Sequence, residues 1–183
     1  MTEPAFADKI VSLHDALDDA AIPHAIGGAL ALAYYAEPRA TVDVDINVFV
    51  GVDEHPAVMA ALDPLGVKGP LANLERDGQV RLHWGPNPVD LFFSYDPFHE
   101  RMRTWTSIVP FGDTQLPILA PEHLLVCKAT FNRPKDWIDI DQILVGVPDL
   151  DESEVRTWLA HLVGTDDDRW RRVDTALREL LGR

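Results

Sequence analysis

The fold is decided by the stretch Thr41-Val-Asp-Val-Asp-Ile-Asn-Val-Phe-Val50. Aliphatic side chains take every second position, and the positions between them carry Asp43, Asp45, Asn47 and Phe49. A period of two is typical of a β-strand, in which successive side chains point to opposite faces of the sheet. We therefore predict a strand over residues 41–50, with the aliphatic residues on one face and both aspartates on the other.

The two aspartates suggest a metal site. Two residues apart on one face of a strand, Asp43 and Asp45 would have Cβ atoms roughly 6–7 Å apart, close enough for both carboxylates to reach one cation. Mg²⁺ prefers carboxylate oxygens and keeps positions open for substrate phosphates. The alternative is a strand with a solvated polar face, but aspartate is disfavoured within strands. We therefore expect this pair to have a functional role.

A second feature precedes this strand. After the short apolar run His24-Ala-Ile, Gly27 and Gly28 stand side by side before Ala29–Ala36, which has the composition of a helix. Adjacent glycines let the backbone approach a phosphate, and a helix N-terminus offers unpaired N–H groups to an anion. The alternative is a glycine pair that only permits a tight bend.

A third carboxylate, Asp90, lies in the apolar run Pro88-Val-Asp-Leu-Phe-Phe93. Burying a lone carboxylate costs several kcal/mol, so Asp90 needs a metal or a cationic partner. The alternatives are a solvent-facing edge position or an ion pair with Arg81 or Arg39.

The remaining elements follow from periodicity and from proline and glycine positions. Helices are predicted at residues 5–21 and 56–62, and strands at 79–84, 89–94, 106–111 and 114–118. The chain then becomes helical, with Pro121 and Pro134 opening two helices and Ser153 capping a third. A fourth helix begins near Asp166–Asp168. We predict an α+β part over residues 1–119 and a helical part over 120–183, packed as one unit.

Composition narrows the function classes. The 183 residues include 30 acidic and 16 basic side chains, for a net charge of −14. This charge disfavours nonspecific binding along a nucleic-acid backbone and suits a metal site or a cationic partner. A single cysteine, no apolar run of ~18 residues and no signal-peptide pattern together predict a cytoplasmic protein without a membrane partner.

The three acidic and glycine features, in this order, resemble the nucleotidyltransferase superfamily of the DNA polymerase β type. That pattern has a hydrophobic-Gly-Gly turn, an Asp-hydrophobic-Asp strand and a third carboxylate on a later strand. The resemblance implies an α+β fold, with a small mixed or antiparallel sheet flanked by helices and a C-terminal helical bundle. The stretch Arg39–Ile46 looks most like the branch that contains AbiEii-type toxins.

The resemblance also implies a site. Asp43, Asp45 and Asp90 would be the catalytic residues and would hold Mg²⁺, with Mn²⁺ as an alternative. The residues expected to bind the nucleotide are Gly27, Gly28, Arg39, Thr41, Lys128 and Asp136. The basic segment from Lys128 to Lys135 would hold a triphosphate, or would instead only offset nearby acidic residues.

The expected reaction is transfer of a nucleoside monophosphate from an NTP to an acceptor hydroxyl. The toxin branch suggests a tRNA end or a protein hydroxyl as acceptor, with an antitoxin as partner. The alternatives are an antibiotic nucleotidyltransferase acting on a small cationic acceptor, such as an aminoglycoside, and a non-catalytic nucleotide-binding protein of the same fold.

Overall fold

The computed structural model describes residues 3–72 and 74–180, without the side chain of Leu180. By its internal contacts the chain divides into two compact units, Met1–Leu30 with Ala40–Leu119, and Ala31–Arg39 with Ala120–Arg183. Residues 31–39 of the predicted first domain therefore group with the C-terminal helices. That the two parts pack as one unit stays a prediction.

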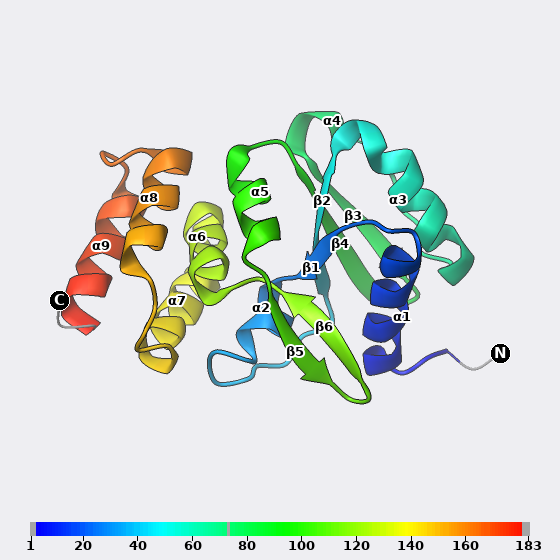
Figure 1. Ribbon diagram of the computed structural model, residues 1–183, viewed down its shortest axis with the longest axis horizontal. Coiled ribbons are helices and arrows are strands. Elements are labelled where there is room, and N and C mark those ends of the chain that lie inside the picture. The colour runs from blue at the N-terminus through cyan, green and yellow to red at the C-terminus, as the bar shows by residue number, and fades with distance from the viewer. Residues whose placement is uncertain (1–2, 73, 181–183) are drawn as a thin grey trace. The chain divides into compact units, whose positions relative to one another are not determined.

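The first unit is built on one mixed sheet (Figure 1). Its strands are β1 (His24–Ile26), β2 (Val44–Gly51), β3 (Gln79–Trp84), β4 (Asn87–Ser94), β5 (Ser107–Phe111) and β6 (Thr114–Ile118). The strand order is β3-β4-β2-β1-β6-β5. The β2–β4 and β1–β6 pairs are parallel, and the other three pairs are antiparallel. The predicted α+β class with a small mixed sheet is confirmed.

Helices complete this unit. They are α1 (Phe6–Asp19), α3 (His55–Leu62), α4 (Leu74–Asp77) and α5 (Pro97–Thr104), with short 3-10 turns at Val52–Glu54 and Asp63–Leu65. The helix α1 buries Ile10, Leu13 and Leu17, whose spacing places them on one face. It contacts α3, and in Figure 1 both helices lie on the same side of β2 and β4.

The two faces of the sheet differ in chemistry. On β2, Val44, Ile46 and Val48 are at most 1% exposed, as the alternation in the sequence predicts. The neighbouring strand β4 buries Val89, Leu91 and Phe93 completely. The intervening positions of both strands belong to the opposite face, where Asp45, Asn47 and Asp90 lie.

The predicted start of β2 is wrong by three residues. The strand begins at Val44, and the Thr41 hydroxyl instead forms a local turn: it accepts a hydrogen bond from the Asp43 N–H at 3.2 Å. Val42 is 61% exposed, and its carbonyl accepts from the Asn87 side chain. Asp43 therefore immediately precedes the strand, because local side-chain bonding competes with strand pairing there.

Two helix predictions also need correction, and α4 and α5 lie where no helix was predicted. The helix after the glycines, α2 (Gly28–Leu32), ends before residue 36, because the next N–H groups form turns back to Ala31 and Leu32. The helix α5 was not predicted, although Asp96 caps it and Pro97 opens it. Ser153 lies inside its helix, and the cap is Asp151, whose carboxylate accepts from the Glu154 N–H at 3.0 Å.

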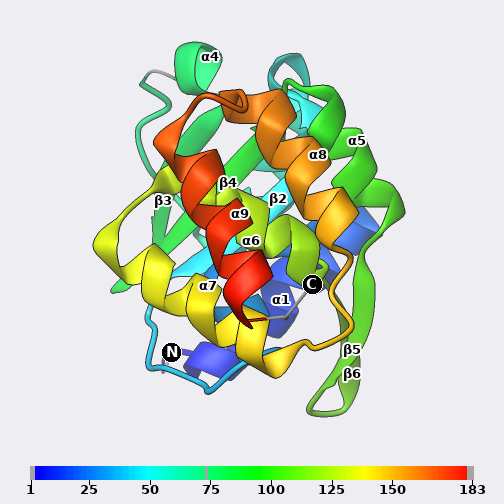
Figure 2. The same cartoon turned by 90° about the vertical axis from the view of Figure 1, so that its left-hand side faces the viewer.

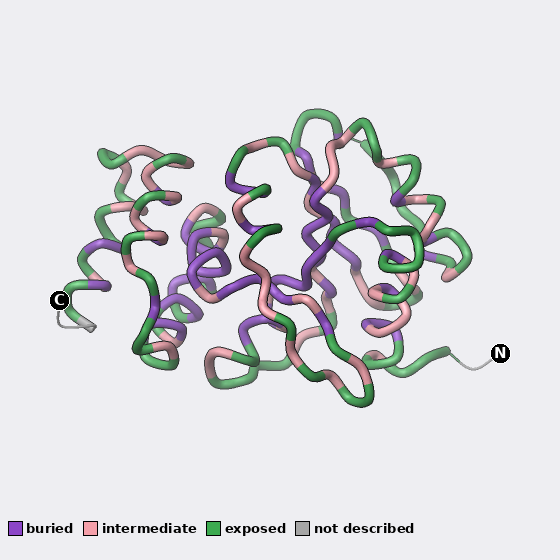
Figure 3. The backbone as a smooth tube through the Cα atoms, viewed as in Figure 1, coloured by how far each residue is buried: buried purple, intermediate pink, exposed green. Residues whose placement is uncertain are grey.

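The second unit centres on α6 (Pro121–Phe131), which contacts α7 (Pro134–Gly146), α8 (Glu152–Val163) and α9 (Asp168–Leu180). Figure 2 shows these four helices, and Figure 3 shows that α6 is largely buried. Pro121 and Pro134 open their helices as predicted. Within the described ranges, every helix is too short or too polar to cross a membrane.

Candidate active site

The Gly27-Gly28 turn lies directly against Asp45. The Gly27 N–H donates to the Asp45 carbonyl at 2.8 Å, which extends the β1–β2 ladder by one residue. Gly28 has a φ of +56°, and a Cβ there would overlap the Asp45 carboxylate. A Cβ on Gly27 would lie 3.0 Å from the Asn47 side-chain nitrogen. The glycines are thus required by the close approach of Asp45 and Asn47. Their contact with a phosphate stays a prediction.

Asp45 and Asp90 are neighbours on adjacent parallel strands. They pair directly in the β2–β4 register, so both side chains belong to the same face of the sheet. Asp90 is 3% exposed, whereas Asp43 and Asp45 are half-buried. Because Asp43 precedes Asp45 by two residues, all three predicted catalytic carboxylates come from one end of this strand pair. The structure therefore places Asp45 beside Asp90, with Asp43 just before the start of β2, and the catalytic role of the three stays a prediction.

Arg81 contacts Asp90 from the edge strand. Its Nε donates to one carboxylate oxygen of Asp90 at 2.8 Å and its Nη2 to the other at 2.6 Å. The two residues are register partners in the antiparallel β3–β4 pair. Hydrogen bonding to Asp90, together with the charges of Asp43 and Asp45, raises the pKa of Arg81 against the opposing effect of its partial burial. The alternative of an Arg81–Asp90 ion pair is thus observed, and within the second unit Arg39 pairs with Asp139.

The three carboxylates can be compared with the ligands that the implied Mg²⁺ requires. Asp43, Asp45 and Asp90 supply the oxygen donors that this cation prefers. In residues 3–72 and 74–180, however, no group of three or more His, Cys, Asp or Glu side chains is arranged to hold a metal ion. Arg81 occupies both oxygens of Asp90. The donor chemistry fits Mg²⁺, whereas in this structure Arg81 compensates the charge of Asp90. Binding of a cation by the three carboxylates stays a prediction.

Arg39 and Lys128 belong to the second unit and share one carboxylate. Lys128 Nζ donates to Asp139 at 2.6 Å, and Arg39 donates two bonds of 3.1 Å to the same group. Lys128 and Asp139 are buried, with 4% and 2% exposure. Burial opposes ionisation of Asp139, but the bonds from the two cations outweigh it and lower the pKa of this carboxyl. Both cations are engaged by Asp139 in this structure, and nucleotide binding by Arg39 and Lys128 stays a prediction.

The last two predicted nucleotide-binding residues stabilise local structure. The Asp136 carboxylate is buried, accepts the Arg133 N–H at 3.1 Å and bonds the Arg133 side chain, which caps the start of α7. Thr41, in the first unit, holds the turn that presents Asp43. Binding of a nucleotide by Asp136 and Thr41 stays a prediction.

Comparisons with known proteins relate this geometry to a fold. No protein-family model and no curated protein matches the chain. Among solved structures, the antibiotic-resistance factor ANT(2'')-Ia superposes with a TM-score of 0.59 at 16% identity, covering 94% of each chain. The lincosamide antibiotic adenylyltransferase LnuA, with lincomycin bound, gives 0.54 at 13% identity, covering 74% of this chain and 94% of LnuA.

A third similar structure is an antigenic nucleotidyltransferase-like protein from Paracoccidioides brasiliensis. It gives a TM-score of 0.55 at 19% identity and covers 94% of this chain and 92% of its own. The chain has the nucleotidyltransferase fold. At these identities the similarity establishes the fold alone, so activity and acceptor need separate arguments. Membership of the AbiEii-type branch stays a prediction.

Two residues of the site in this nucleotidyltransferase fold were not predicted to be functional. Asn47 follows Asp45 on the same face of β2 and lies against Gly27. Its position was visible in the alternation of the strand. Arg81 was considered only as a partner that would explain the burial of Asp90, although the predicted strand at residues 79–84 places it on a polar face.

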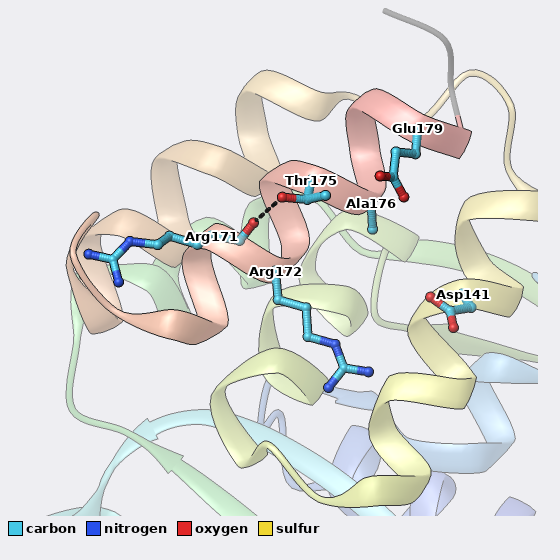
Figure 4. Close-up of a pocket in the computed structure, with 6 residues that line it drawn as sticks. All are labelled: Asp141, Arg171, Arg172, Thr175, Ala176 and Glu179. Atoms are coloured by element: carbon cyan, nitrogen blue, oxygen red, sulfur yellow. Dashed lines mark hydrogen bonds between the residues drawn. The ribbon is translucent and has the colours of Figure 1, made fainter.

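A hollow of about 500 Å³ lies elsewhere, between α7 and α9 in the second unit. Figure 4 shows its lining, which consists of Asp141, Arg171, Arg172, Thr175, Ala176 and Glu179. The guanidinium of Arg172 stacks 3.9 Å from the ring centre of Trp137. The hollow mixes both charge signs and includes none of the predicted site residues, so we assign it no function.

Proposed function

We propose that the protein transfers a nucleoside monophosphate from an NTP to an acceptor hydroxyl group. The observation that carries this proposal is the side-by-side placement of Asp45 and Asp90 on β2 and β4, next to the Gly27-Gly28 turn. The nucleotidyltransferase fold supports it. An intact set of three carboxylates also favours an enzyme over a non-catalytic nucleotide-binding protein of the same fold.

The site residues then have distinct tasks. Asp43, Asp45 and Asp90 would hold Mg²⁺, or Mn²⁺. When bound, the cation neutralises phosphate charge and lowers the pKa of the acceptor hydroxyl. Asp90 would orient that hydroxyl and accept its proton. The hydroxyl oxygen forms a bond to the α-phosphorus, and the bond to the leaving pyrophosphate breaks.

The glycine turn supports the carboxylates in this scheme. Because Gly28 has no side chain, Asp45 can approach the backbone at the start of α2. We place the phosphates beside Gly27 and Gly28. Lys128 and Arg39 would contribute only after leaving Asp139.

Charge favours a small cationic acceptor. The first unit, which carries the three carboxylates, has 16 acidic and 6 basic side chains by sequence, whereas the second unit has 14 and 10. Such an excess of negative charge attracts a cation and repels a polyanion. One similar structure is named as an antibiotic-resistance factor, ANT(2'')-Ia, and another as a lincosamide antibiotic adenylyltransferase, LnuA. A tRNA end or a protein hydroxyl, as in a toxin with an antitoxin partner, is the second candidate, suggested by the sequence around Arg39–Ile46.

One labelling experiment separates the acceptors. The protein is incubated with each α-labelled NTP and Mg²⁺ against a panel of aminoglycosides and lincosamides, total tRNA, and a cell lysate. We expect label on a cationic small molecule. Label on tRNA or on protein supports transfer with the second acceptor class. Absence of label from all three, by a protein that binds NTP, contradicts transfer and favours a binding protein.

A further inference from the structure

The Arg81–Asp90 pair is asymmetric in exposure. The side chain of Arg81 is 56% exposed, whereas that of Asp90 is 4% exposed. Arg81 belongs to β3, which is an edge strand of the sheet, and Asp90 belongs to the neighbouring strand β4. A buried carboxylate without a cationic partner is strongly destabilising. Arg81 can therefore move into solvent at little cost, but Asp90 cannot lose Arg81 without another cation.

The charges of the other two carboxylates also act on Arg81. Arg81, Asp90 and Asp45 follow one another in register across β3, β4 and β2. The Asp90 hydrogen bonds contribute most to the elevated pKa of Arg81, and Asp43 and Asp45 contribute through their charges. A single protein cation thus interacts with the three groups that the proposed function assigns to a divalent cation.

We propose that Arg81 is a positioning residue that holds Asp90 in place until a divalent cation replaces it. This inference rests on the proposed function, since it assigns the cation to Asp43, Asp45 and Asp90. In the cation-free protein, the two bonds of the guanidinium fix the Asp90 carboxylate and compensate its charge. A divalent cation would compete with the Arg81 guanidinium for the Asp90 carboxylate, so Arg81 lowers the affinity for the cation.

The test measures cation binding directly. Mn²⁺ is titrated into the full-length protein and followed by electron paramagnetic resonance of the free ion, without nucleotide. We expect Arg81→Gln to bind Mn²⁺ at least about tenfold more tightly than the unmodified protein, because the competing charge-assisted bonds are lost. Equal affinities would overturn the proposal.

Arg103→Gln is a matched control. Arg103 forms the same two-bond contact, at 2.7 and 2.6 Å, with Glu100 on α5 of the same unit, and this pair is exposed. The control therefore removes one positive charge and one ion pair of the same geometry. If Arg103→Gln tightens Mn²⁺ binding as much as Arg81→Gln does, net charge explains the effect and the proposal fails.

Thermal unfolding provides a second measurement. Arg81→Gln should melt below the unmodified protein without cation and should gain more in Tm when Mn²⁺ is added. A purely structural role for Arg81 would lower Tm without enlarging this gain. If Arg81→Gln does not fold, Arg81→Lys replaces it, because lysine keeps the charge but lacks the two-bond geometry. Its Mn²⁺ affinity should then exceed that of the unmodified protein, and an unchanged affinity overturns the proposal.

The outcomes for Arg81 and for the proposed function are distinguishable. Tighter Mn²⁺ binding by Arg81→Gln, in a protein that transfers no label from any NTP, supports the role of Arg81 and contradicts the proposed function. Conversely, label transfer by the unmodified protein, together with unchanged Mn²⁺ affinity in Arg81→Gln, supports the function and overturns the role of Arg81.

Discussion

The carboxylate of Asp45 occupies the space into which a side chain at Gly28 would project. Gly28→Ala should therefore both strain the backbone, whose φ is +56°, and displace Asp45. We expect a loss of roughly 2–4 kcal/mol in the free energy of unfolding, measured in urea, together with loss of nucleotidyl transfer.

Gly112→Ala is the control for this substitution. Gly112 has a φ of +58°, but nothing lies within 4 Å of the position of its missing Cβ. It should therefore show only the backbone cost, about 1–2 kcal/mol, and retain transfer. An equal loss in the two variants would mean that the contact with Asp45 contributes nothing.

The buried pair of Lys128 and Asp139 leads to a second prediction. Asp139→Asn leaves the ammonium of Lys128 buried without its counter-charge, which should cost about 3–5 kcal/mol in the free energy of unfolding. The double variant Lys128→Met/Asp139→Asn should lose less, because no unpaired buried charge remains. Urea denaturation of both variants measures the difference.

Arg39→Gln is the control variant for the substitutions in the Lys128–Asp139 pair. The side chain of Arg39 is 37% exposed, so its removal should cost about 1 kcal/mol or less while Lys128 still compensates Asp139. A double variant that is no more stable than Asp139→Asn alone would contradict the account of an uncompensated lysine.

The burial of two histidines predicts that the free energy of unfolding depends on pH. Burial is the main cause that lowers the pKa of both His24 and His99 below 6.5, against the effect of their backbone hydrogen bonds. The charge of His14, which hydrogen-bonds His24 at 2.8 Å, lowers the pKa of His24 further, and Asp18 opposes it. The folded state therefore takes up protons less readily than the unfolded state.

The sign of the effect follows. The contribution of each histidine is complete above pH 6.5 and is lost as the pH falls, by up to about 1.4 kcal/mol per pH unit for each group. Urea denaturation between pH 8 and pH 5 should show this decline. His24→Gln and His99→Gln should each reduce the slope. Identical slopes in all variants would contradict this account.

Much of the fold could be predicted from local signals. Pro121 and Pro134 open α6 and α7 at the predicted residues, because proline fits the first turn of a helix. The start of β2 could not be predicted, since Thr41 and Asp43 form a side-chain turn within an alternating sequence. The helix α5 has few apolar residues, and its best signal was the cap Asp96 followed by Pro97.

The sequence predicted the acidic residues of the site but not the contact between Arg81 and Asp90. Asp45 and Asp90 stand out because aspartate is unusual in apolar strands, and the structure places them side by side. The pairing of Arg81 with Asp90 depends on the register of the β3–β4 hairpin. The two residues between these strands, Gly85 and Pro86, set that register, and counting outward from them would have placed Arg81 opposite Asp90.

For Arg39, Lys128 and Asp136, the sequence motif does not show which other side chains of the protein contact them. A basic side chain near a predicted nucleotide site indicates phosphate binding only if no carboxylate of the protein engages it. Asp139 contacts both Arg39 and Lys128, and it lies 11 residues beyond Lys128, on the next helix. Such pairing depends on how α6 packs against α7, which the sequence pattern does not specify.

The central claim is that Asp43 and Asp45 serve nucleotidyl transfer. Transfer from α-labelled NTP with Mg²⁺ to the acceptor found in the labelling panel tests it most directly, with Asp43→Asn/Asp45→Asn compared with Asp113→Asn, a change at an exposed turn. We expect label transfer by the unmodified protein and by Asp113→Asn, and a loss of at least about a thousandfold in the double variant. Transfer at an unchanged rate by a folded Asp43→Asn/Asp45→Asn protein would contradict the account.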